Sequence, residues 1–133
     1  MQFTSLAVII VGGVWLIGIA SLMAARPSYC LQILAVMGAK LEGGDWQLHF
    51  TEQALRLVAG AALILRSPFS KMPLVLWVFG WMIVISSIII IASPVRWHGA
   101  FATWWSQRLT QSIIRALSPV SLLLGVGLMY LAI

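Results

Sequence analysis

The chain has 133 residues, of which 62% are hydrophobic and 8% are charged. Soluble domains carry about 25% charged residues, so this composition argues against a soluble domain and predicts one integral membrane domain over residues 1–133. The net charge of +5 is typical of contact with anionic lipid headgroups and does not point to nucleic acid, while the single cysteine, Cys30, excludes an internal disulfide.

The first stretches predict a membrane span followed by an interfacial helix. Residues 6–25 include no charge and are long enough to cross the hydrocarbon core. No basic residue precedes them and the apolar run is longer than that of a signal peptide, so we expect this span to be retained. Residues 28–41 are apolar but interrupted by polar side chains, which favours a helix lying in the interface.

Small residues in the predicted spans indicate where helices pack closely, because they allow backbones to approach one another in a membrane. The first span contains two pairs of small residues four positions apart, and two later glycines are further candidates. These packing residues are Ala20 with Ala24, Ser21 with Ala25, Gly60 and Gly125.

A second span is predicted from Asp45, a suitable N-cap, to about Leu65. The apolar part of this span lies between Arg56 and Arg66, which are separated by only nine residues. Both arginines must therefore snorkel or be sheltered by neighbouring helices. Residues 66–73 form a tight connection to the third span, residues 74–92. That span has nineteen residues without a charge and is roughly 28 Å long as a helix.

The segment 94–115 predicts an amphipathic interfacial helix, because aromatic residues recur on one side and arginines lie near headgroup depth. The uncharged residues 116–133 predict a fourth span, which we expect to begin at Ser118–Pro119 as an N-cap followed by proline. The lipid-binding residues expected on the amphipathic segment are Arg96, Trp97, Trp104, Trp105, Arg108 and Arg115.

The two halves, 1–70 and 71–133, can be superimposed as an internal repeat. Each has a span with a tryptophan, then a proline (Pro27 or Pro94), an interfacial stretch, an arginine (Arg56 or Arg115) and a second span. The proline-to-arginine spacing is 29 in the first half and 21 in the second, which requires an insertion near residues 38–45. Since each half crosses twice, the halves would run parallel, about an axis along the membrane normal.

The second half also resembles a known family. Residues 81–130 contain Pro-x-x-Trp at 94–97, then Arg115, Gly125 and Tyr130, and this pattern is similar to that of small two-span bacterial inner-membrane proteins of uncharacterised function. Pro119 departs from the family's glycine after the arginine, whereas Gly60 of the first half fits it. The resemblance implies a fold unit, a bacterial inner membrane and a tandem duplication, but no activity.

Cation distribution predicts the orientation. Two cations, Arg66 and Lys71, lie on the side of the chain ends, and six lie on the other: Arg26, Lys40, Arg56, Arg96, Arg108 and Arg115. The positive-inside rule then places the interfacial helices in the cytoplasm and the termini in the periplasm.

The chain offers few parts for catalysis, so we expect no enzyme, no catalytic residue and no metal site. The three acids, Glu42, Asp45 and Glu52, lie in one hydrophilic stretch rather than a dry cleft. His49 and His98 are the only histidines and are the candidates for haem ligation, although both fall at the borders of spans.

We therefore expect a non-enzymatic accessory or scaffolding subunit that packs against a larger membrane complex, or against copies of itself, and binds anionic lipid. One alternative is a haem- or quinone-associated redox anchor that uses His49 or His98. Another is a small oligomeric transporter or channel, for which Arg56 is the only charge expected at depth.

Overall fold

The computed structural model describes residues 1–133 and is entirely helical apart from short connections, which confirms the prediction of an all-α protein. The chain folds into six α-helices and one 3-10 turn. In chain order they are α1 (Gln2–Ala25), α2 (Pro27–Glu42), α3 (Trp46–Arg66), the 3-10 turn η1 (Ser67–Phe69), α4 (Pro73–Ala92), α5 (Val95–Arg108) and α6 (Gln111–Ala132).

Four of these helices are long and apolar enough to cross a membrane: α1, α3 with η1, α4 and α6. Only 17% of the most apolar stretch is buried inside the chain in α1, α4 and α6, and 28% in α3. Large hydrophobic side chains therefore face outward along every span, as expected where lipid or another subunit is the surrounding medium. The chain is a multi-pass helical membrane protein.

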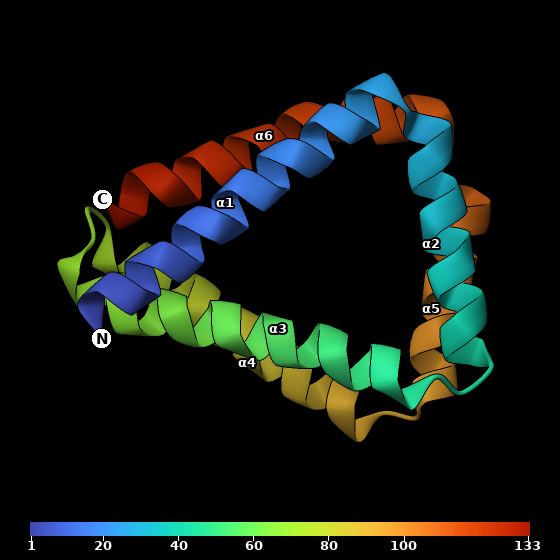
Figure 1. Ribbon diagram of the computed structural model, residues 1–133, viewed down its shortest axis with the longest axis horizontal. Helices are drawn as coiled ribbons and strands as arrows, with labels where there is room; N and C mark the ends of the chain where they lie inside the picture. Colours follow the sequence, from blue (N-terminus) through green and yellow to red (C-terminus); the bar gives the residue numbers. More distant parts are fainter.

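The six helices form three antiparallel pairs, α1 with α6, α3 with α4, and α2 with α5. Figure 1 shows these pairs as the three sides of a triangle. The two spanning pairs meet at one corner, where the chain ends and η1 lie, and diverge toward the α2·α5 pair. At the closed corner Arg66 Nε donates to the Ala132 carbonyl at 2.8 Å, and the Lys71 amide donates to the Leu131 carbonyl at 3.0 Å.

Glycines set the closeness of both spanning pairs. A Cβ on Gly60 of α3 would lie 2.9 Å from the Gly80 carbonyl oxygen of α4, and a Cβ on Gly125 of α6 would lie 2.7 Å from that of Gly13 of α1. Backbones this close leave no room for a side chain at those positions. Gly60 and Gly125 therefore lie where the two helices of each pair approach closely.

The other predicted packing residues behave differently. Ala20 is 2% exposed and its carbonyl accepts a hydrogen bond from the Ser118 hydroxyl of α6 at 2.8 Å. Ser21, Ala24 and Ala25 lie on the exposed face of α1, and the Ser21 hydroxyl donates within its own helix, to Ile17. The prediction of two small-residue pairs was wrong within this chain: four-residue spacing identifies a face of a helix, but not whether a partner covers it.

The segment 94–115 is not one helix. α5 ends at Arg108, and α6 begins at Gln111 after the extended residues Leu109 and Thr110. The Thr110 side chain caps α6 by accepting from the Ile113 amide at 3.3 Å. Arg115 thus belongs to the fourth span, and Pro119 lies inside that helix instead of starting it. The predicted start at Ser118–Pro119 was wrong, because the Ser118 hydroxyl bonds across to α1.

Candidate functional site

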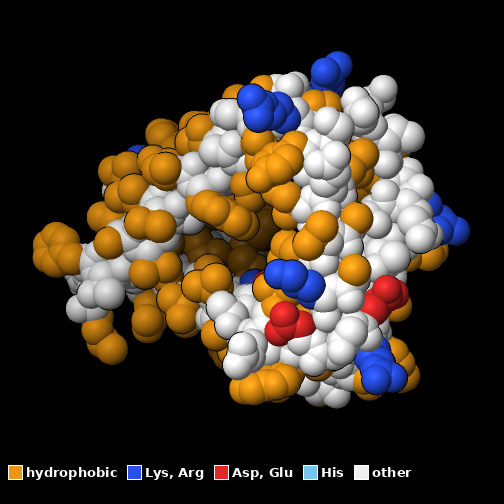
Figure 2. All heavy atoms as spheres, turned by 45° about the vertical axis from the view of Figure 1, so that its right-hand side comes forward, with side chains coloured by type: hydrophobic (Ala, Val, Ile, Leu, Met, Phe, Trp, Pro, Cys, Tyr) orange, Lys and Arg blue, Asp and Glu red, His pale blue; other side chains and the backbone are white.

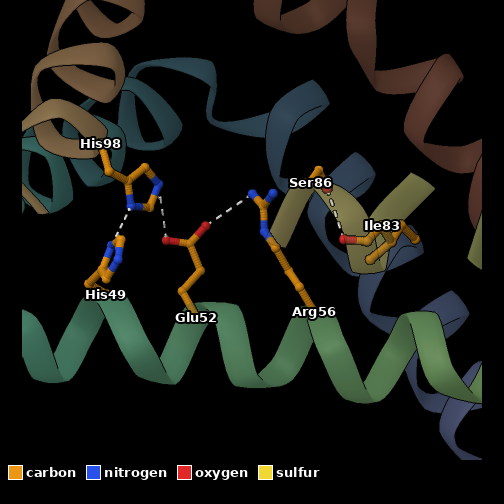
Figure 3. A network of polar contacts seen from close by, with 6 residues as sticks. All are labelled: His49, Glu52, Arg56, Ile83, Ser86 and His98. Carbon is orange, nitrogen blue, oxygen red and sulfur yellow. Dashed lines mark hydrogen bonds and ion pairs between the residues drawn. The ribbon is translucent and has the colours of Figure 1, made fainter. Parts of the chain in front are cut away.

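Two histidines meet where α3 and α5 begin. The Nδ1 atoms of His49, in the first turn of α3, and His98, in the first turn of α5, lie 3.1 Å apart. Asp45 fixes the start of α3 by accepting from the Leu48 amide at 2.9 Å, which confirms the predicted N-cap. α5 begins at Val95 directly after Pro94, whose fixed φ places His98 one turn into the helix. Figure 3 shows the two rings facing each other from different helices.

Glu52 and Arg56 extend this contact along α3. His98 Nε2 lies 3.6 Å from Glu52 Oε2, and Arg56 Nη2 donates to Glu52 Oε1 at 3.0 Å. The spacing of four residues places Glu52 and Arg56 on the same face of α3, one turn beyond His49. We name these four residues, His49, His98, Glu52 and Arg56, the polar cluster.

The partners of His98 assign its tautomer. An N–H on Nε2 faces the Glu52 carboxylate, so Nδ1 carries a lone pair and accepts the N–H of His49 Nδ1. His49 Nε2 is then an unprotonated acceptor, and it is buried without a hydrogen-bond partner. One proton thus lies between the two imidazole rings, and the His49 ring is fully buried.

His98 holds its neutral form more strongly than an exposed histidine does. Burial is the largest influence and lowers its pKa from 6.5, Glu52 opposes this shift, and the charges of His49 and Arg56 lower the pKa further. At neutral pH His98 is therefore a neutral imidazole beside the Glu52 carboxylate and the Arg56 guanidinium.

Three more polar side chains near this end of the molecule lack partners. The amide of Gln53 on α3, the hydroxyl of Ser87 on α4 and the hydroxyl of Thr103 on α5 are buried without a hydrogen bond, and Gln53 and Ser87 are fully buried. Sequence reasoning did not single out Gln53 or Thr103. The neighbouring Ser86 differs from Ser87, because its hydroxyl donates to the Ile83 carbonyl at 2.9 Å.

Two adjoining cavities open onto the cluster, and both are lined by Arg56, His98 and Phe101. One, of about 360 Å³, continues over Ile90, Ser93 and Trp97 of α4 and α5. The other, of about 270 Å³, continues between α2 and α5 and includes Glu52. Figure 2 shows the hollow between the diverging helices, surrounded mainly by hydrophobic atoms. The arrangement places a charged pair at the edge of an apolar space.

The predicted lipid-binding side chains are all exposed, and two of them, Trp97 and Trp105, also line the two cavities. On α5, the Arg108 guanidinium lies 3.9 Å from the centre of the Trp104 ring, and Trp104 and Trp105 contact each other edge to face. Arg96 and Trp97 lie near the start of α5, and Arg115 is on α6. The structure therefore does not join all six residues into one helix face.

The geometry bears on the proposed cofactors. His49 and His98 touch each other through Nδ1, so no porphyrin fits between the rings as placed, and bis-histidine haem does not match this arrangement. No group of three or more His, Cys, Asp or Glu side chains is close enough to hold a metal ion. The cluster offers hydrogen bonding and charge.

No protein-family model matches this chain, and neither a curated protein nor a solved structure matches it.

Proposed function

We propose that this chain is a non-enzymatic accessory subunit of a bacterial inner membrane, which packs against a larger membrane complex and binds anionic lipid at its cytoplasmic end. The observation that carries the proposal is the apolar hollow between the two spanning pairs. In a membrane such a space is filled by lipid or by a partner, and a subunit of a larger complex can accept a partner helix there.

The lining of this hollow supports the proposal. Leu16 of α1, Leu63 of α3, Phe79 of α4 and Leu124 of α6 surround a space of about 370 Å³ that is open to the outside. Only Ser86 interrupts the apolar wall. Removing apolar surface from water would stabilise a bound side chain or acyl chain by about 25 cal/mol for each Å². Replacing lipid gains almost nothing, so the shape of the hollow must determine which partner binds.

The arrangement of the helices also supports an interfacial role for α2 and α5. They close the wide end of the triangle and lie across the direction of the four spans (Figure 1). The exposed residues Arg96, Trp97, Trp104, Trp105 and Arg108 on α5 would then lie at headgroup depth, with Arg115 at the start of α6. The excess of cations at this end favours the cytoplasmic side, which leaves the termini and η1 in the periplasm.

We further propose that the chain arose by tandem duplication. Exchanging the halves turns the α1·α6 pair into α4·α3 and leaves α2·α5 unchanged. Gly13 and Gly80 are 67 residues apart, as are Pro27 and Pro94, and each of the two glycines meets a glycine of the partner helix. The partner glycines, Gly60 and Gly125, are 65 residues apart.

This register replaces the one based on arginines. Arg56 lies in the middle of α3 but Arg115 lies in the second turn of α6, so these two residues do not occupy matching places. The glycine register needs an insertion of two residues near the α2–α3 connection, since the offset changes from 67 to 65.

The test is purification from its own host in a mild detergent, with a chromosomal tag and no overexpression. The wild type should co-purify with other membrane proteins. Leu124→Gln, which places an amide in the hollow, should separate the chain from those proteins. Val11→Gln is the matched control, because Val11 is exposed on α1 but does not line the hollow. A wild type that purifies only as a monomer would refute the accessory role.

A further inference from the structure

Arg56 is a charge placed inside a span. It lies ten residues from either end of α3, about 15 Å by helix rise, whereas α1 and α4 have no ionisable side chain. Charged residues at such depth face a cavity or a partner, because hydrocarbon cannot solvate them. Glu52, one turn toward the interface, draws the guanidinium in that direction.

Most of the hydrogen-bonding capacity of Arg56 is unused. A guanidinium has five N–H donors, and the chain supplies one acceptor, Glu52 Oε1. The side chain is 45% exposed and points away from α3 on the same side as Glu52 (Figure 3). Both cavities at the cluster include Arg56, so its remaining donors are available to a ligand there.

The cluster needs acceptors from a ligand and has few of its own to offer. Both Glu52 oxygens face a partner, one toward Arg56 and the other toward His98. His98 stays neutral at pH 7 because burial lowers its pKa. α5 begins beside the cluster without a side-chain cap, so its N-terminus adds partial positive charge. Apart from His49 Nε2, which is buried, the unmet groups are thus donors, and an anion complements them.

The surroundings select an amphiphile over a free anion. Beyond Arg56 the two cavities are lined by Ile90, Trp97 and Phe101 on one side and by Leu34, Met37 and Trp105 on the other. A molecule whose head reaches Arg56 must therefore leave the rest of its length against apolar side chains. Phosphate and guanidinium form strong bidentate hydrogen bonds, which an ammonium cannot reproduce.

We propose that the pocket between α2, α3, α4 and α5 binds the phosphate headgroup of one anionic phospholipid, with Arg56 as the residue that holds the phosphate. The proposal rests on the membrane setting of the proposed function but not on the exposed arginines of its Trp/Arg surface. The lipid chains lie against the apolar side chains that line the two cavities, and Glu52 positions the guanidinium.

Native mass spectrometry of the purified full chain tests this, with phosphatidylglycerol and phosphatidylcholine added at equal concentration. The wild type should retain one phosphatidylglycerol with about a tenfold preference, the gain expected from one charge-assisted pair. Arg56→Gln should abolish the preference and Arg56→Lys should restore part of it. Arg26→Gln is the matched control, since Arg26 is exposed between α1 and α2, lines neither cavity and should leave the preference unchanged.

Ala102→Phe provides a second variant that keeps every charge. Ala102 lines the smaller cavity, so a phenyl ring there should exclude the lipid even though Arg56 is intact. An unchanged preference in Arg56→Gln would overturn the proposal. So would displacement of the lipid by inorganic phosphate alone, which would show a free-anion site. Equal losses in Arg56→Gln and Arg26→Gln would also overturn it, while leaving the Trp/Arg surface of the proposed function intact.

Discussion

The imidazoles of His49 and His98 share one hydrogen bond, Nδ1 to Nδ1 at 3.1 Å, and it joins two helices whose histidines are 49 residues apart in the chain. The contact is made only while at least one of the two nitrogens is unprotonated, because two N–H groups cannot donate to each other. Acidification should therefore weaken the contact between the starts of α3 and α5.

We predict that the protein loses stability as pH falls below 6.5. The pKa of His98 in the folded state lies below its ordinary value of 6.5, mainly through burial, so the unfolded chain binds the proton first. Stability is complete above pH 6.5 and declines as pH falls toward the folded pKa. Thermal unfolding in detergent should show a falling Tm over this window. His98→Gln should flatten the dependence, and a wild-type Tm that rises on acidification would contradict it.

Adding a methyl group at the glycine contacts should separate the spanning pairs. Gly60→Ala and Gly125→Ala place a Cβ 2.9 Å and 2.7 Å from a carbonyl oxygen of the facing helix, so each should cost about 1–3 kcal/mol. Gly127→Ala, on α6 with nothing within 4 Å, is the control and should be neutral. The measurement is the free energy of unfolding in mixed micelles. Equal effects at positions 125 and 127 would disprove the close contact.

Two serines of α6 should stabilise its pairing with α1. The Ser118 and Ser121 hydroxyls donate to the Ala20 and Leu16 carbonyls at 2.8 and 3.0 Å. Hydrogen bonds between membrane helices average about 0.6 kcal/mol, so Ser118→Ala with Ser121→Ala should cost about 1 kcal/mol. Ser106→Ala removes a bond within α5 only and serves as the comparison. The same unfolding assay measures both.

The N-cap of α3 should matter for the polar cluster as well as for stability. Asp45→Ala removes the acceptor for the Leu48 amide and should cost about 1 kcal/mol. Because His49 follows directly in the first turn, fraying should also expose its ring, and hydrogen exchange of residues 46–50 should accelerate. Asp45→Asn keeps an acceptor and should behave nearly as the wild type. Unchanged exchange in Asp45→Ala would contradict the capping role.

Residue chemistry predicted the helices better than it predicted their contacts. Uncharged length identified the first and third spans and most of the fourth, and Asp45 gave the start of α3, because these signals are local. The break at Leu109–Thr110 was not predicted, since it has neither glycine nor proline, while Pro119 lies inside α6. Proline is tolerated inside membrane helices, so its position alone does not define where a helix starts.

The candidate site was predictable only as separate parts. The Glu52–Arg56 pair follows from spacing on one helix, because residues four positions apart share a helix face. That His98 completes the cluster depends on how α5 folds back along α2, which no local pattern encodes. The glycine partners of Gly60 and Gly125, Gly80 and Gly13, were missed for the same reason, since facing positions depend on the pairing of whole helices.

The central claim is that α2 and α5 lie at one membrane face and both chain ends lie at the other. Single cysteines in a Cys30→Ser background test it, with an impermeant maleimide applied to intact spheroplasts. Phe3→Cys, at the exposed start of α1, should react at once, and Ala100→Cys, exposed on α5, should react only after the membrane is permeabilised. Reaction of both cysteines from the same side would contradict the account.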